Sequence, residues 1–93
     1  MNALTADEAR SRLGKITGWK IESGELAKTF QFKDFVAALK FVNAVGDAAE
    51  TAGHHPDIDI RYNRVRLSLV THDAGGLTAK DFDLARQADR LAI

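Results

Sequence analysis

The residues best suited to chemistry in this sequence are its three histidines, His54, His55 and His72. An imidazole titrates near neutral pH, so it can both donate and accept a proton at a reacting centre. All three histidines lie where we expect a helix or a strand to end, and functional side chains concentrate at such junctions. We therefore interpret them as catalytic residues for acid–base chemistry.

Each histidine also has a purely structural interpretation. His54 and His55 follow a long predicted helix, where imidazoles can bond the free carbonyls and suit the negative end of the helix dipole. His72 lies in a glycine-containing loop, where a single histidine is commonly solvated. Two adjacent imidazoles do not fit together in a hydrophobic core, and Pro56 fixes the direction in which the chain leaves them. We therefore expect the pair at a surface cleft.

Two carboxylates could support the histidines. Glu50 precedes His54 by four residues, so a continuous helix would place its carboxylate one turn away, where it could orient the imidazole or raise its pKa. A simple surface pair is the alternative. Asp81 is the third residue of a helix predicted after Thr78, where it can complete a capping box, and we interpret it as mainly structural.

Metal and nucleophilic chemistry fit the sequence less well. Three histidines can bind a catalytic zinc ion, but the spacings His-x-His and His-x-x-x-His are missing, and neighbours on an extended backbone point to opposite sides. The chain has no cysteine and no serine in a Gly-x-Ser-x-Gly turn. We therefore expect no metal at the site.

The elements that must position these residues follow from local signals. Helices should begin after the capping residues Thr5, Asp34 and Thr78, and the second should end at Gly53. The predicted order is a helix over 6–13, strands over 19–22 and 26–32, a helix over 35–52, strands over 57–62 and 65–71, and a helix from 79. Two tight hairpins and the order αββαββα favour an α+β fold, with a four-stranded antiparallel sheet and three helices on one face.

Apolar periodicity predicts which side chains are buried. The long helix should bury one stripe, comprising Phe35, Ala38, Leu39, Val42, Val45, Ala49 and Ala52. A second apolar flank at Phe41 and Ala48 could support a homodimer or homotetramer, which would help so small a core. Tyr62 should share a strand face with Ile58 and Ile60, so we expect it in the core.

Composition narrows the class of protein. The 93 residues suffice for one domain over 1–93, and their 13 basic and 13 acidic side chains are interleaved along the chain. This pattern does not favour direct nucleic-acid binding, which usually shows as a basic face. The first residues carry neither a basic patch nor an apolar run, and no apolar stretch approaches membrane-spanning length, so we expect no membrane association and a cytoplasmic location.

The histidines belong to a longer pattern with fixed gaps. It comprises Glu50-x-x-x-His54-His55-Pro56, Tyr62, Val65, Thr71-His72, Gly76-x-Thr78, Asp81 and Leu84-Ala85, with Gly18-Trp19 and the run Phe30 to Phe35 upstream. In these residues the chain resembles the pterin-4a-carbinolamine dehydratases, also called 4a-hydroxytetrahydrobiopterin dehydratases. In animals these proteins are also dimerization cofactors of a homeodomain transcription factor. The resemblance covers nearly the entire chain.

The resemblance implies dehydration of the carbinolamine that forms when an aromatic amino-acid hydroxylase uses tetrahydrobiopterin. The products are quinonoid dihydropterin and water, and no metal or organic cofactor is implied. By the same resemblance, His54 and His72 would be the acid–base pair and His55 mainly a substrate-binding group. Gly53, Thr71 and Asp73 would complete the pterin site, and the partners would be the pterin, possible hydroxylases and further copies of the chain.

The chain departs from this family at the expected pocket wall. Animal members carry an acidic residue just before the histidine pair and a tryptophan two residues after the proline, where this chain has Gly53 and Ile58. Val70 stands where a small hydroxyl residue often occurs. These changes leave the imidazoles in place but bear on the preference for the pterin side chain. The alternative function is a protein-binding module, acting as a coactivator or as an assembly factor for another enzyme.

Overall fold

The computed structural model describes residues 2–93 and begins with the helix α1 (Ala6–Leu13), as predicted. Its capping box forms in both directions. The Thr5 hydroxyl accepts from the Glu8 amide at 3.1 Å, and the Glu8 carboxylate accepts from the Thr5 amide at 2.8 Å. This backbone hydrogen bond lowers the pKa of the Glu8 carboxyl group, because it favours the ionised form.

The sheet consists of two antiparallel hairpins joined through their inner strands. The strands are β1 (Lys20–Glu22), β2 (Glu25–Gln31), β3 (Asp57–Arg61) and β4 (Arg64–Leu69). All pairs are antiparallel in the order β1-β2-β4-β3, and the central pair β2–β4 sets Leu26 opposite Leu69 and Phe30 opposite Val65. The long central strands therefore form the floor on which the helices pack.

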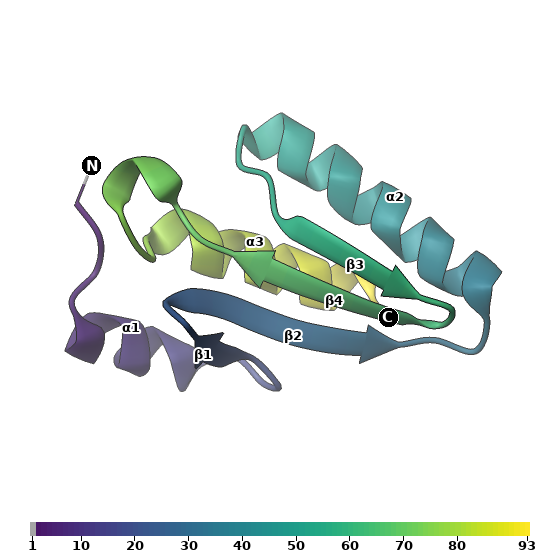
Figure 1. Ribbon diagram of the computed structural model, residues 1–93, viewed down its shortest axis with the longest axis horizontal. Coiled ribbons are helices and arrows are strands. Elements are labelled where there is room, and N and C mark those ends of the chain that lie inside the picture. The colour runs from purple at the N-terminus through teal and green to yellow at the C-terminus, as the bar shows by residue number, and fades with distance from the viewer. Residues whose placement is uncertain (1) are drawn as a thin grey trace.

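Two further helices, α2 (Phe35–Ala52) and α3 (Ala79–Leu91), contact each other and cover the apolar face of the sheet (Figure 1). Alternating residues of β2 and β4 are buried beneath them, and Ala9 of α1 joins the same core. On the opposite face the side chains of Thr29, Arg64 and Arg66 are exposed. The structure thus confirms the α+β fold, the order αββαββα and the antiparallel sheet.

The second hairpin turns one residue earlier than predicted. β3 ends at Arg61, and Tyr62 lies in the turn with a φ of 52°. Two-residue hairpin turns favour positive φ because that twist matches the flanking strands. Tyr62 therefore leaves the strand's alternation, and its side chain is 66% exposed, so the prediction that it lies in the core is wrong. Ile58, which was expected on the same face, is 38% exposed at the edge of the sheet.

The buried stripe of α2 lies to one side of the predicted one. Ala38, Val45 and Ala49 are buried as expected, but Phe35 and Leu39 are 45% and 40% exposed. Phe41, assigned to an outer flank, is buried, with its ring 4.7 Å from that of Phe30 and 4.9 Å from that of Phe32. The reason is that β2 presents aromatic rings to this side of the helix. Among residues 2–93, no helix combines the length and apolar character that crossing a membrane requires.

Candidate active site

His54 is turned inward by the end of α2. Gly53 closes the helix in the left-handed conformation, with φ 64°, and the His54 amide then donates to the Ala49 carbonyl at 3.1 Å. His54 is only 9% exposed, and its Nε2 atom lies 2.6 Å from Oδ1 of Asp81 on α3. A buried imidazole is thereby held by a carboxylate that is 27 residues away in the sequence.

Both carboxylate oxygens of Asp81 take part in hydrogen bonds. The residue is fully buried, and its Oδ2 atom accepts from the Thr71 hydroxyl and from the Thr78 amide, each at 2.9 Å. The hydroxyls of Thr71 and Thr78 lie 2.8 Å apart. The predicted capping role of Asp81 is therefore correct, but the same carboxylate also orients His54. A satisfied polar network of this kind restricts each member to one position.

His55 points the other way, into solvent. Its Nε2 atom lies 2.7 Å from Oε1 of Glu50, and both side chains are largely exposed. The expected pairing of Glu50 with His54 is wrong, because α2 ends at Ala52 and the left-handed Gly53 breaks the helical relation between them. Glu50 instead contacts the neighbouring imidazole.

His72 and Asp73 lie on a closed turn after β4. Thr71 and Gly76 pair as an isolated antiparallel bridge, with hydrogen bonds of 3.1 and 3.4 Å between their backbones. Between them the 3-10 turn η1 (His72–Ala74) ends at Gly75, whose φ is 74°. The bridge projects His72 and Asp73 beyond the sheet, and both residues are exposed.

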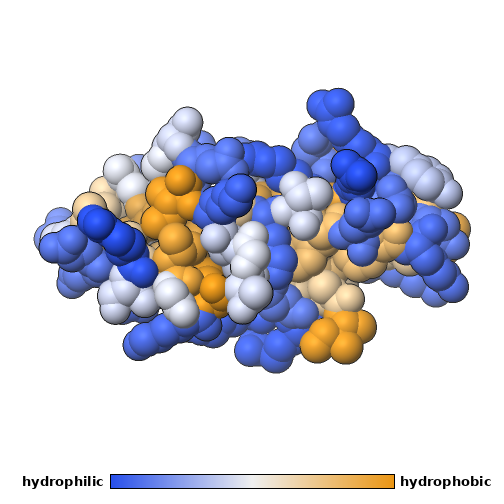
Figure 2. Space-filling model, turned by 90° about the horizontal axis from the view of Figure 1, so that it is seen from below, coloured by the Kyte–Doolittle hydropathy of each residue, from blue (hydrophilic) through white to orange (hydrophobic). Residues whose placement is uncertain are grey.

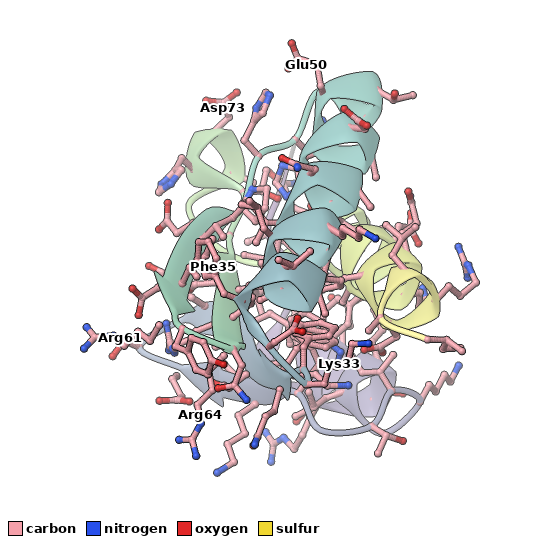
Figure 3. The ribbon with its side chains drawn as sticks, turned by 90° about the vertical axis from the view of Figure 1, so that its right-hand side faces the viewer. Lys33, Phe35, Glu50, Arg61, Arg64 and Asp73 are labelled. Carbon is pink, nitrogen blue, oxygen red and sulfur yellow. The ribbon has the colours of Figure 1, made fainter. Side chains whose placement is uncertain are left out.

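These segments enclose a cavity of about 240 Å³. Six of the eight lining residues are predicted substrate-binding or catalytic residues, namely Gly53, His54, His55, Thr71, His72 and Asp73. The two predicted supporting residues contact the histidines: Glu50 contacts His55, and Asp81 contacts His54. Figure 3 shows Glu50 and Asp73 at the top of the view, on α2 and η1, with Arg61 and Arg64 at the lower left. The structure thus brings all three imidazoles to one cavity.

Two lining residues add to the predicted set. Val70 forms part of the wall, as the comparison of sequence patterns suggested, whereas Ile58 does not line the cavity. Lys80 also lines it, and sequence reasoning missed this lysine. A signal was present, because Lys80 lies in the first turn of a helix whose neighbouring cap, Thr78, immediately follows the loop of His72.

Larger hollows lie elsewhere on the molecule. One of about 500 Å³ lies between α1 and β1, and Leu13 and Ile21 are among the residues that line it. Figure 2 shows a strip of hydrophobic surface, in orange, at the left of the view. The hollow between α1 and β1 contains no histidine or carboxylate. The smaller cavity is therefore the better candidate for proton transfer, because it alone gathers the imidazoles among the pockets found within residues 2–93.

Two of the histidines at the cavity contact carboxylates. Within the described chain, no three histidine or carboxylate side chains are grouped to hold a metal ion. The Nε2 atoms of His54 and His55 each contact a different carboxylate instead.

Comparison with known proteins identifies the family of this chain. The model of the family described as pterin 4 alpha carbinolamine dehydratase matches residues 2–91. The chain belongs to this family. A pterin-4-alpha-carbinolamine dehydratase of Acidobacterium capsulatum is 57% identical over 91 residues, which cover 98% of this chain and 99% of that protein. The relative of the same name from Roseiflexus castenholzii is 58% identical over 92 residues and covers the same shares.

Solved structures of related proteins share the fold of this dehydratase family member. The crystal structure of a transcriptional coactivator/pterin dehydratase from Brucella melitensis superposes with a TM-score of 0.95, at 34% identity over 99% of this chain and 100% of that one. A pterin dehydratase-like protein described as a RuBisCO assembly factor in the alpha-carboxysome has a TM-score of 0.66 at 24% identity, over 80% of this chain and 86% of that one. The second likeness concerns the fold alone.

Proposed function

We propose that this chain dehydrates 4a-hydroxytetrahydropterin to quinonoid dihydropterin and water by histidine acid–base catalysis. The observation that carries the proposal is the convergence of His54, His55 and His72 on one cavity, with His54 buried against Asp81. Relatives more than half identical over nearly the whole chain carry the name of this activity.

The reaction needs one proton delivered and one removed. The C4a hydroxyl accepts a proton and leaves as water, the proton on the adjacent N5 is taken up, and the N5 electron pair forms the C4a=N5 double bond. The net change is loss of water, with no oxidant or reductant. Two imidazoles placed at one cavity suit this exchange, because an imidazole can donate a proton from one form and accept it in the other.

His54 is the better placed of the pair to take up the proton. Its Nε2–H donates to the Asp81 carboxylate, which leaves Nδ1 as the free lone pair. As Nδ1 gains a proton, the nearby carboxylate stabilises the imidazolium and keeps the ring in place. His72, exposed on η1, is then the acid that protonates the leaving hydroxyl. His55, exposed and in contact with Glu50, contributes mainly to binding.

Substrate binding uses the rim of the same cavity. Gly53, without a side chain, leaves one side open, and Val70 presents an apolar wall to a planar ring. The side chain of Thr71 is engaged with Asp81, so Thr71 contributes to binding through its backbone and by fixing the turn that holds Asp73. The preference for the pterin side chain then depends on Gly53 and Val70 rather than on Ile58.

The role in metabolism follows from the substrate. The carbinolamine arises when an aromatic amino-acid hydroxylase consumes tetrahydrobiopterin, so the chain would act in recycling that pterin. We also assign to α2 the surface of a homodimer or homotetramer. Its exposed Phe35, Val36 and Leu39, with Ile58 at the neighbouring sheet edge, are large apolar side chains that association would bury.

The test of the activity is the rate of quinonoid dihydropterin formation from freshly generated 4a-hydroxytetrahydropterin, with the spontaneous rate subtracted. Purified protein should accelerate the reaction by orders of magnitude, and a metal chelator should leave the acceleration unchanged. A folded protein with no acceleration would move the assignment to a protein-binding module. Strong inhibition by the chelator, reversed by zinc, would contradict the metal-free mechanism.

A further inference from the structure

A second hollow lies at the end of α3 remote from the histidines. It is bounded by residues 15–17, by β2 and by the last turns of α3, and its volume is about 500 Å³. We refer to it as the α3 C-terminal pocket. Asp81 and Asp89 mark the two ends of the helix, and their spacing of eight residues corresponds to about 12 Å along the axis. The pocket is therefore separate from the candidate active site.

The pocket is built around a lysine on the inner face of the sheet. Lys28 lies between Leu26 and Phe30 on β2, where strand alternation points all three toward the helices. Its Nζ donates to Oδ1 of Asp89 at 2.7 Å and to the Thr17 carbonyl at 2.9 Å, and lies 4.7 Å from the centre of the Phe30 ring. Three segments distant in sequence are thereby fixed to one another.

Asp89 also contacts a buried aromatic side chain in this arrangement. Besides Lys28, it accepts from the indole Nε1 of Trp19, at 3.2 Å to one oxygen and 3.1 Å to the other. Trp19 is 5% exposed, so its ring forms part of the core behind the pocket. Among the ion pairs of residues 2–93, Lys28 is the only cation within 4.0 Å of this carboxylate.

Positive charge is in excess at this site, although the whole chain has no net charge. Lys15, Lys28, Arg86 and Arg90 line the pocket with Asp89 as the single acidic residue. Arg86 has a further partner in Asp83 at 3.2 Å, whereas no ion pair within 4.0 Å among residues 2–93 involves Lys15 or Arg90. The end of the α3 dipole adds about half a negative charge, which is smaller than this excess.

The rest of the lining is apolar apart from Thr17. Ile16, Phe30 and Ala92 contribute hydrocarbon surface next to the cationic side chains. Cationic side chains beside hydrocarbon surface can bind an anionic group and the apolar part of the same ligand. We propose that the α3 C-terminal pocket binds a small organic anion, whose phosphate or carboxylate contacts Lys15 and Arg90 and whose apolar body lies against Ile16 and Phe30.

The structure supplies a specific probe for this proposal. Trp19 is the only tryptophan of the chain, so its indole N–H gives a single resolved cross-peak in a ¹H–¹⁵N spectrum. Titration of the full chain with phenyl phosphate through the millimolar range should shift this peak saturably, together with amides of residues 15–17 and 86–92. No saturable shift would overturn the proposal.

Variants and matched ligands test the charge and the apolar surface separately. Arg90→Ala and Lys15→Ala should each weaken binding of phenyl phosphate by about tenfold, the loss of one charged contact. Arg64→Ala, an exposed arginine on the outer sheet face, should leave the affinity unchanged. Inorganic phosphate should bind more weakly than phenyl phosphate, and benzyl alcohol should not bind. Equal binding of benzyl alcohol would contradict an anion site, and equal binding of inorganic phosphate would contradict an organic one.

Discussion

Nε2 of His54 lies 2.6 Å from Oδ1 of Asp81, and both residues are buried, whereas the similar contact of His55 with Glu50 is exposed. The two pairs have the same chemistry but different surroundings. A buried pair is shielded from solvent and fixed by its other hydrogen bonds, so it can hold a ring in one orientation and one tautomer. An exposed pair is screened and mobile.

Asp81→Asn should therefore lower kcat by about 10²-fold or more, because the amide can present N–H to His54 and favour the wrong tautomer. Glu50→Gln is the matched control, and its kcat should stay within about threefold of the unaltered protein. Steady-state kinetics of both variants, with circular dichroism to verify folding, measure the difference. Equal effects of the two substitutions would contradict the role given to Asp81.

The two capping threonines provide a test of the network's contribution to stability. Thr5→Ala removes an exposed cap and should cost about 1 kcal/mol of unfolding free energy. Thr78→Ala removes a cap and also the hydroxyl that contacts Thr71 in the buried network, so its cost should be about 2–3 kcal/mol. Urea unfolding of both variants measures the two costs. A larger destabilisation by Thr5→Ala than by Thr78→Ala would contradict a stabilising contribution of the buried network.

The helix caps, which depend on residues close together in the sequence, were predicted correctly, and the contact between His54 and Asp81, which are distant in the sequence, was not. The bounds of α1, the three caps and the closing Gly53 depend on neighbours within a few residues, and all are as predicted. The link between His54 and Asp81 joins residues 27 apart, and the capping pattern already gave Asp81 a sufficient local role. No local signal could show that the same carboxylate reaches a histidine.

Packing between distant segments explains the other differences between the predicted and the observed structure. Helical periodicity predicts that α2 has a buried side, but the aromatic rings of β2 determine that Phe41 is buried and Phe35 is not. The second hairpin turns one residue earlier than predicted, so Tyr62 lies in the turn and not in the strand. The positions of the three histidines at junctions suggested a catalytic role, and the fold brings them to one cavity, whereas the position of Lys80 in the first turn after Thr78 was a weaker signal that the analysis of motifs did not use.

Lys80 should affect substrate binding more than chemistry. Its ammonium lines the cavity and can donate to a carbonyl or ring nitrogen of the pterin. Lys80→Met keeps the aliphatic stem and removes the donors, so KM should rise several-fold while kcat changes little. Lys40→Met, on an exposed position of α2, is the control and should change neither constant. A fall in kcat at constant KM would instead place Lys80 in the chemical step.

The exposed apolar side of α2 should govern association. Val36 is 61% exposed and lies next to Phe35, so a charge introduced there would be buried in an assembled oligomer at a high cost. Val36→Lys should yield monomers in light scattering coupled to size-exclusion chromatography, whereas Lys20→Glu, an exposed change on the edge strand β1 away from α2, should leave the oligomer intact. A monomeric unaltered protein at micromolar concentration would contradict association through this surface.

The most direct test of the central claim compares the unaltered protein with His54→Ala in the formation of quinonoid dihydropterin from 4a-hydroxytetrahydropterin. Loss of a positioned acid–base group should lower the catalysed rate by about 10²–10⁴-fold. His55→Ala, which removes the exposed neighbour, should act mainly on KM, and circular dichroism should show that both variants are folded. A folded His54→Ala variant with the rate of the unaltered protein would contradict catalysis by the buried histidine.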